Sequence, residues 1–253
     1  MTDSTTRPKV VVITGAGRGI GAACARVFAT AGYAVVIAER DAQTGASLER
    51  ELNSIGHRAL FVQTDVSLED DLERLIATAL ERFGRVDVLV NNAGRNQRTP
   101  LLETSTATWL ELLALNLSSV FWACRAAMPQ LISTGGSIVN VSSLVGLQGQ
   151  ADAVAYSAAK GGVIALTKTL ALDFAPLGVR VNCVCPGDVR TPLYDEWLSD
   201  QPDPVGTLSS ITARLPVGRM GTPEETAQAV LFLAQNGFAN GAILTLDGGK
   251  SLG

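Results

Sequence analysis

Seven short runs rich in Val, Ile and Leu alternate along this chain with longer segments of helical periodicity. Several of these runs are continuously apolar, which is typical of strands that are covered on both faces. Strands that alternate with helices favour a parallel sheet joined by right-handed crossovers. The strands are expected at Lys9–Thr14, Ala34–Glu39, Arg58–Gln63, Val86–Asn91, Ser137–Val141, Val179–Val184 and Ala242–Leu246.

The helical patterns between these runs complete an α/β fold. We expect one domain over residues 1–253, doubly wound, with helices on both faces of a seven-stranded parallel sheet, because no linker, repeat or low-complexity tract interrupts the pattern. Residues 188–220 break the rhythm, since they are proline-bearing and poorly periodic. Because this segment follows the carboxyl end of a strand, we interpret it as a substrate lid. The helices are expected at Gly19–Gly32, Ala42–Ile55, Leu68–Phe83, Ala107–Ile132, Ala153–Ala175 and Pro223–Gln235.

The composition agrees with a compact globular domain and narrows its partners. Hydrophobic residues make up 47% of the 253 positions and charged residues 17%, which is enough to bury a real core. The formal net charge is −4 and no long basic run occurs, so we expect no nucleic-acid partner. The first residues are polar and no apolar stretch looks long enough to span a membrane, so we expect a cytoplasmic protein without a membrane partner.

The four cysteines and the single histidine indicate no metal or redox motif. Cys183 and Cys185 form a C-x-C in a strand pattern, where alternation sends both side chains to one face of the sheet. This spacing is neither the redox C-x-x-C nor a common zinc spacing, so we interpret the cysteines as buried free thiols. His57 alone cannot form a histidine-based centre, and we expect no metal site.

A glycine-rich turn joins the first expected strand to the first expected helix. The segment Thr14–Gly21 does not fit the common G-x-G-x-x-G fingerprint, because Ile20 occupies the slot of the third glycine. Gly15, Gly19 and Gly21 fit G-x-x-x-G-x-G instead. Glycines allow close backbone approach, and a helix N-terminus presents free N–H groups to a pyrophosphate. The turn alone could be structural, but its place in a βαβ unit predicts a dinucleotide site.

Glu39 ends the second strand and indicates which dinucleotide binds. A carboxylate at this place can accept hydrogen bonds from ribose hydroxyls and would repel a 2′-phosphate, which favours NAD. Arg18 and Arg40 point the other way, because guanidinium groups suit phosphate. We give Glu39 the greater weight and expect NAD, with NADP as the less favoured cofactor.

Tyr156 and Lys160 are four residues apart in an unbroken helical pattern, so their side chains leave the same face. An ammonium beside a phenol favours the phenolate and lowers the tyrosine pKa from its ordinary value of about 10. Such a tyrosine can exchange a proton with a substrate hydroxyl near neutral pH. The pair is a weak signal alone and gains its weight from the glycine turn.

Taken together, these motifs resemble those of the short-chain dehydrogenase/reductase family, and the resemblance covers nearly the whole chain. It implies a Rossmann fold and an NAD(P)-dependent oxidoreductase that interconverts a secondary alcohol and its ketone by hydride transfer. Asp65 is similar to the acidic residue that meets adenine in that family. The other matching segments are Thr14–Gly21, Asn91–Gly94, Pro186-Gly187 with Thr191 beyond, and Asp247–Gly249.

The resemblance also implies roles for individual residues. Tyr156 would be the general base in oxidation and the general acid in reduction, and Lys160 would lower its pKa and bond the nicotinamide ribose. Ser143 would hold the substrate oxygen, and Asn116 would anchor a water that passes protons to solvent. Any one of these four residues, considered alone, could instead have a purely structural role. The implied cofactor contacts are Gly15, Arg18, Gly19, Ile20, Gly21, Glu39, Arg40, Asp65, Val66, Asn91, Ala93, Gly94, Tyr156, Lys160, Pro186, Gly187, Val189 and Thr191.

Substrate contacts are expected on loops at the carboxyl ends of the strands. Asp188 follows Pro186-Gly187 where many relatives carry an apolar or aromatic residue, which disfavours an apolar substrate. We therefore predict a polar secondary alcohol or its ketone, such as a polyol, a sugar or a hydroxy acid. The candidate contacts are Arg95, Val145, Gln150, Asp188, Arg190, Tyr194 and Trp197.

Two other functions remain open at this point. One is an NADP-dependent 3-oxoacyl thioester reductase, and the other is a non-catalytic dinucleotide-binding sensor, which has no reason to keep all four catalytic positions. Members of the family are usually tetramers, and the apolar helices Ala107–Ile132 and Ala153–Ala175 permit a homo-oligomer. The string Gly249-Lys250-Ser251-Leu252-Gly253 matches the hydrolase G-x-S-x-G, but no helix follows it, so we reject that function.

Overall fold

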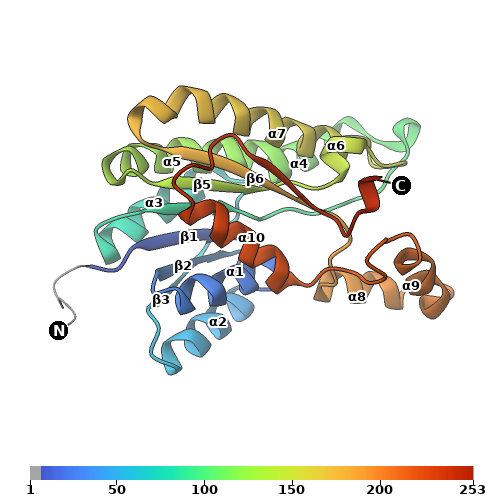
Figure 1. The fold of residues 1–253 in the computed structure, drawn as a ribbon, viewed down its shortest axis with the longest axis horizontal. Helices are drawn as coiled ribbons and strands as arrows, with labels where there is room; N and C mark the ends of the chain where they lie inside the picture. Colours follow the sequence, from blue (N-terminus) through green and yellow to red (C-terminus); the bar gives the residue numbers. More distant parts are fainter. Residues whose placement is uncertain (1–6, 253) are drawn as a thin grey trace.

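A computed structural model describes residues 7–252 and contains one seven-stranded sheet in the order β3-β2-β1-β4-β5-β6-β7 (Figure 1). Every neighbouring pair of strands is parallel, so the predicted doubly wound fold class is confirmed. The strand order reverses between β1 and β4, which is the place where open α/β sheets bind ligands at the carboxyl edge. The strands are β1 (Val10–Thr14), β2 (Ala34–Glu39), β3 (Ala59–Gln63), β4 (Val88–Asn91), β5 (Ser137–Val141), β6 (Arg180–Pro186) and β7 (Ile243–Leu246).

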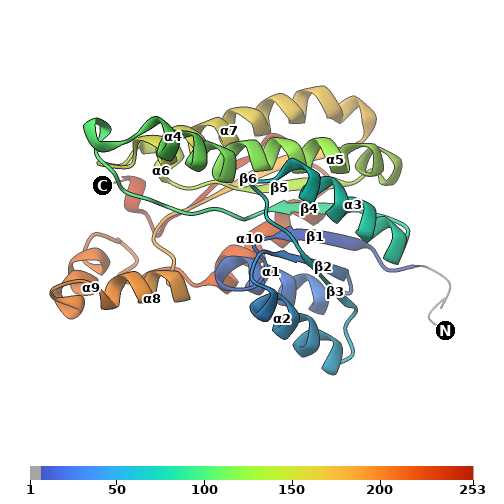
Figure 2. The same cartoon turned by 180° about the vertical axis from the view of Figure 1, so that it is seen from behind.

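Helices cover both faces of the sheet and enclose two hydrophobic cores (Figures 1 and 2). The strand alternation divides the cores, since Val10 and Val12 face one layer while Val11 and Ile13 face the other. The first layer contains α3 (Glu69–Phe83), α5 (Ser119–Thr134) and α7 (Val154–Phe174), and the second contains α1 (Gly19–Thr30), α2 (Ala42–Ser54) and α10 (Pro223–Gln235).

The single helix predicted over residues 107–132 is interrupted. The structure has α4 (Thr106–Leu113), a π-helical turn η2 (Ala114–Ser118) and then α5. Asn116 lies in this turn and its Nδ2 donates to the Leu112 carbonyl at 3.0 Å. A side-chain bond of this kind satisfies a carbonyl where the regular ladder widens, and π-turns are frequent at functional sites.

The helical segment Thr106–Thr134 is long and apolar enough, by length and composition alone, to cross a membrane. The expectation that no such span exists is therefore wrong on those two criteria. Its apolar character has a local explanation, because Val120, Ala127 and Leu131 are buried in the core against the sheet. Packing of this kind is what a core helix of an α/β layer requires.

The segment 188–220, expected to be irregular, contains two helices, α8 (Pro192–Ser199) and α9 (Pro204–Thr212), which form a projection beside the main body (Figures 1 and 2). Each begins with a proline, and each is capped by the residue before it, Thr191 or Asp203. That signal in the sequence could have predicted both helices. The remaining short elements are η1 (Leu101–Glu103), α6 (Val145–Gln148), η3 (Ala175–Leu177) and η4 (Lys250–Leu252).

Candidate active site

Helix α7 delivers Tyr156 and Lys160 to the carboxyl end of β5. The Lys160 side chain is buried, and its Nζ donates to the Val141 carbonyl at 2.9 Å. The same Nζ lies 5.7 Å from the centre of the Tyr156 ring. The structure therefore brings the two residues together as their spacing predicts, on the ligand side of the sheet.

Ser143 lies in the turn that follows β5 and faces the same phenol. Its Oγ accepts a hydrogen bond from Val145 N at 3.2 Å, and its side chain lies near enough to Tyr156 to act on the pKa of that phenol. The next residue in the turn, Leu144, donates its N–H to the Pro186 carbonyl at 2.8 Å. The turn is thus tied to the end of β6, and Ser143 and Tyr156 converge between β5 and β6.

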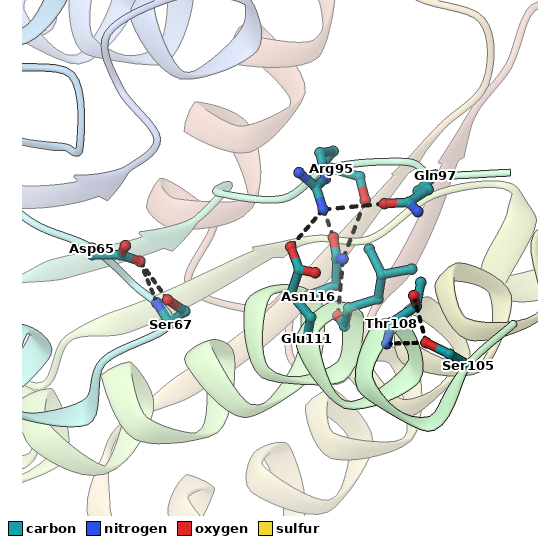
Figure 3. Close-up of polar contacts among 9 residues, drawn as sticks. Asp65, Ser67, Arg95, Gln97, Ser105, Thr108, Glu111 and Asn116 are labelled. Atoms are coloured by element: carbon teal, nitrogen blue, oxygen red, sulfur yellow. Dashed lines mark hydrogen bonds and ion pairs between the residues drawn. The ribbon is translucent and has the colours of Figure 1, made fainter. Parts of the chain in front are cut away.

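Asn116 is fixed by the backbone of Arg95 (Figure 3). The Asn116 Oδ1 accepts from Arg95 N at 3.0 Å, and its Nδ2 donates to Arg95 O at 3.2 Å. A Cβ placed on Gly94 would lie 2.7 Å from Asn116 Oδ1 and 3.4 Å from Lys160 Nζ. Only a glycine fits between these two groups, so the backbone at Gly94 holds Asn116 and Lys160 as close neighbours.

The pKa of Tyr156 is raised, which contradicts the expectation that Lys160 lowers it. Burial disfavours the phenolate and outweighs the opposite effect of the hydrogen bond with Ser143. Lys160 is itself so buried that its pKa falls to about 8, because burial disfavours the ammonium. Desolvation of both groups is therefore the larger effect in the chain without ligands, and the spacing in the sequence carries no information about it.

The glycine turn packs tightly against the end of β4. Gly15 has φ +62°, and a Cβ there would lie 2.8 Å from the Ala93 Cα. A Cβ on Gly21 would overlap the Gly15 carbonyl oxygen and would lie 2.7 Å from Asn92 Nδ2. That amide nitrogen donates to the Thr14 and Gly15 carbonyls, at 3.0 Å each. The turn thus has the close backbone approach that a dinucleotide pyrophosphate needs.

The N-terminus of α1 has no side-chain cap. Arg18 occupies the N-cap position and its side chain makes no capping bond, whereas Asp41, Ser105 and Thr222 cap α2, α4 and α10. Uncapped first-turn N–H groups beside a glycine turn fit an anionic phosphate group. The Arg18 guanidinium turns away toward Glu196 at 3.3 Å, so the backbone is the better phosphate ligand.

Glu39 is held at the mouth of the glycine turn by backbone N–H groups. Its Oε2 accepts from Gly17 N at 3.0 Å, and its Oε1 accepts from Arg40 N at 2.8 Å and Asp41 N at 3.2 Å. Arg40 is exposed. This arrangement fits the adenine ribose of a dinucleotide, since the carboxylate is fixed where ribose hydroxyls can donate to it.

Other cofactor candidates have different surroundings. Asp65 accepts hydrogen bonds from Ser67 N at 3.0 Å and Ser67 Oγ at 2.6 Å (Figure 3), and the neighbouring Val66 is buried. Asn91 points into the sheet, where its Nδ2 donates to Asn140 Oδ1 at 2.9 Å. The contacts predicted for Ile20, Ala93, Pro186, Gly187, Val189 and Thr191 stay predictions, and Thr191 Oγ1 accepts from Tyr194 N at 3.2 Å.

The two polar substrate candidates before α7, Arg95 and Gln150, each bond to neighbouring polar side chains. The Arg95 guanidinium pairs with Glu111 of α4 at 2.7 Å and bonds Gln97 at 3.1 Å (Figure 3). Gln150 Oε1 accepts from Asn96 Nδ2 at 3.3 Å. Val145 begins α6, two residues after Ser143. Arg95 therefore positions Asn116 through its backbone, a role that its sequence position alone did not reveal.

The candidates in the segment 188–220 belong to α8 and to the connection between β6 and α8. Arg190 pairs with Asp195 at 2.9 Å, and both side chains are exposed on the surface. Tyr194 and Trp197 form an edge-to-face pair with ring centres 5.2 Å apart. The Tyr194 hydroxyl is buried and has no hydrogen-bond partner among the described residues.

Three residues near the site carried no functional prediction. Ser142 donates its hydroxyl to the Lys160 carbonyl at 2.8 Å and so fixes α7 on β5. Cys183 and Cys185 lie on one face of β6 with their sulfur atoms 3.8 Å apart, and both are buried free thiols, as expected. The positive charge of Lys160 acts on the pKa of both thiols, so they lie near that lysine.

Proton exchange at a phenol beside a dinucleotide turn is the chemistry of NAD(P)-dependent alcohol dehydrogenases and ketone reductases, and this chain is an enzyme of that class. It belongs to the short chain dehydrogenase family, whose sequence model matches residues 9–202.

Solved and curated proteins agree with this assignment. L-fucose dehydrogenase of Oryctolagus cuniculus is 45% identical over 97% of this chain and 86% of its own length. Cis-4-hydroxycyclohexanecarboxylate dehydrogenase of Sinomonas cyclohexanicum is 44% identical over 95% of this chain and 96% of its own. The crystal structure of an actinorhodin polyketide ketoreductase with NADPH superposes with a TM-score of 0.91, at 36% identity, over 96% of this chain and 97% of that one.

Proposed function

We propose that the enzyme interconverts a polar, hydroxyl-rich secondary alcohol and its ketone with NAD, and that Tyr156 exchanges the substrate proton. The observation that carries this proposal is the convergence of Tyr156, Ser143 and the buried Lys160 at the carboxyl edge of the sheet, beside the glycine turn. When bound, the nicotinamide accepts or supplies the hydride.

Four side chains of the protein have separate roles in substrate binding and proton transfer. Tyr156 takes the proton of the substrate hydroxyl during oxidation and returns it during reduction. Ser143, whose side chain lies near that phenol, holds the substrate oxygen. Lys160 has a pKa of about 8, so it can hold or release a proton near neutral pH. Asn116 is fixed beside Lys160 and supports the transfer of that proton toward solvent.

The role of Tyr156 is tested by Tyr156→Phe, with Tyr33→Phe as the matched control on the distant end of the sheet. We expect Tyr156→Phe to bind NAD with unchanged affinity by calorimetry and to lose turnover, because the phenol proton is gone. The control should keep both properties. Unchanged turnover in Tyr156→Phe would contradict the proposal and would favour a dinucleotide-binding sensor.

NAD is proposed as the cofactor because Glu39 is held toward the ribose position while Arg18 is engaged by Glu196. NADP stays the alternative cofactor, because the actinorhodin polyketide ketoreductase structure contains NADPH. Initial rates with NADH and with NADPH, measured separately on one ketone, decide between them. A preference for NADPH would also favour the alternative function as a 3-oxoacyl thioester reductase.

The substrate is proposed from the polar loops at the carboxyl edge and from the names of the relatives. Three of these relatives are named as dehydrogenases of L-fucose, cis-4-hydroxycyclohexanecarboxylate and meso-2,3-butanediol, and each of these compounds carries a hydroxyl group. We expect turnover in a panel of polyols and sugars, followed by NADH absorbance. Equal turnover of a bare hydrocarbon alcohol and its hydroxylated analogue would count against a polar substrate.

A homo-oligomer, with a tetramer as the expected form, is proposed from the outer surface of the helical layers. Leu110 on α4, Phe121 on α5 and Leu172 on α7 are large apolar side chains exposed in the single chain. Exposed apolar residues on neighbouring helices suit burial between copies. Sedimentation at several protein concentrations measures the oligomeric state, and a monomer at all of them would refute the proposal.

A further inference from the structure

The turn formed by residues 247–252 contacts both ends of the lid. A Cβ on Gly187 would lie 2.9 Å from the Asp247 Cα, which shows how closely the turn approaches the first lid residues. At the other end of the lid, Val217 N donates to the Gly248 carbonyl at 3.2 Å. The turn therefore sits between the two places where the lid joins the rest of the molecule.

The turn presents Lys250 in a fixed position. The carboxylate of Asp247 organises it from within, because Oδ1 accepts from Gly249 N at 3.0 Å and Oδ2 accepts from Ser251 N at 2.8 Å. Lys250 Nζ then lies 2.7 Å from Asp188 Oδ2, and the two side chains are 33% and 23% exposed. Among the ion pairs of the described residues, only that of Arg85 with Asp87 is more buried than this one.

The pair lies beside the reaction centre. Asp188 is two residues beyond Pro186, whose carbonyl holds the turn that contains Ser143 and Leu144. Burial, and after it the charge of Asp188, raises the pKa of Tyr194 to about 12. The Tyr194 hydroxyl has no protein partner, and no hydrogen bond within the described residues reaches Asp188 Oδ1. The second carboxylate oxygen of Asp188 is therefore open to a hydrogen bond from a ligand.

We propose that Asp188 and Lys250 form a charge-balanced wall of the substrate site that selects neutral, polyhydroxylated substrates over carboxylates. This inference rests on the proposed function and names the substrate class for the same site. A substrate hydroxyl can donate to Asp188 Oδ1. A substrate carboxylate meets a like charge in Asp188, while the ammonium that could compensate it is already paired. Lys250 acts as a positioning residue, since it neutralises and holds Asp188.

The test compares two ligands of one shape and different charge, cis-4-hydroxycyclohexanecarboxylate and its carboxamide. Their dissociation constants are measured by calorimetry on the full chain saturated with NAD. In wild type we expect the amide to bind more tightly. Asp188→Asn keeps the shape and frees the ammonium, so the preference should move toward the carboxylate by about tenfold or more.

Substitution of the lysine should act in the opposite direction. Lys250→Met leaves the Asp188 charge uncompensated, so the carboxylate should bind still more weakly relative to the amide, while Lys250→Arg should restore the wild-type ratio. Arg26→Met, which removes the partner of Glu51 on the far side of the molecule, is the matched control and should leave the ratio unchanged.

The ratio of the two dissociation constants, carboxylate over carboxamide, shows whether the Asp188–Lys250 pair acts on the substrate or only supports the structure. A ratio that is the same in wild type, Asp188→Asn and Lys250→Met would overturn the proposal and would leave the pair as a simple tether of the lid. Binding of neither ligand to the wild-type NAD complex would overturn it as well. Turnover of the alcohol panel is recorded separately, so loss of the proposed function is recognised by absent NADH formation and not by the ratio.

Discussion

Replacement of Lys160 by Met should stabilise the fold while it removes activity. Lys160 is 4% exposed, and burial lowers its pKa from 10.5 to about 8. A pKa difference of this size between the unfolded and folded chain corresponds to a penalty of about 3 kcal/mol for keeping the ammonium in the folded state. Loss of its hydrogen bond leaves the Val141 carbonyl without that partner, which costs about 1 kcal/mol. The net gain expected for Lys160→Met is therefore about 2 kcal/mol near pH 6.5.

The gain must depend on pH in a defined direction. Below pH 8 the lysine is charged in both the folded and the unfolded chain, so wild type carries the whole penalty. Between pH 8 and pH 10.5 the folded chain loses this proton first, so the penalty shrinks as the pH rises. The advantage of Lys160→Met should therefore be largest at pH 6.5 and should decline toward pH 10.

Urea unfolding of both proteins at pH 6.5, 8 and 9.5, at one protein concentration and without cofactor, measures this difference. Lys160→Arg serves as the control, since arginine keeps its charge at every pH tested. Its free energy of unfolding should therefore not increase relative to that of wild type at high pH. The reasoning is refuted if Lys160→Met is less stable than wild type at pH 6.5, or if its advantage is independent of pH.

Three further perturbations test the site and its support. Gly21→Ala should abolish dinucleotide binding by calorimetry, because the new Cβ overlaps the glycine turn, while Gly237→Ala, where a Cβ has open space, should bind normally. Glu39→Gln should weaken NAD binding and narrow the preference for NAD over NADP, and an unchanged ratio of the two dissociation constants would show that this carboxylate does not read the ribose. Asn140→Ala should lower the free energy of unfolding by about 2–3 kcal/mol in urea, because it leaves buried polar partners unpaired between β4 and α7, and a loss below about 0.5 kcal/mol would contradict that view.

The strands could be predicted from the sequence because each is a short apolar run bounded by polar or turn residues. All seven lie at their predicted places, with ends that differ by at most two residues. The glycine turn could also be predicted, since Gly15 adopts a positive φ and Gly21 has no room for a side chain. Local chemistry determines both features, so a short window of sequence contains the necessary information.

Other properties depend on contacts between distant segments. The raised pKa of Tyr156 follows from burial by several elements, and the spacing to Lys160 could not reveal it. The bond between Asn116 and the Arg95 backbone joins residues 21 positions apart. Lys250 pairs with Asp188, 62 positions earlier in the chain. The segment Gly249–Gly253 was considered only as a hydrolase motif, so the sequence analysis did not predict this contact with the segment 188–220.

The lid begins after β6 and ends before α10, and its two ends meet at its base. Val189 and Gly221 form a parallel bridge, and Gly221 N donates to the Asp188 carbonyl at 3.0 Å, so both ends of the excursion are joined at its base. An insertion with adjacent ends can be exchanged as a cassette without moving the scaffold from which it emerges. If this segment is exchanged between homologues, we therefore expect a change in which substrates are accepted while the rest of the fold stays in place.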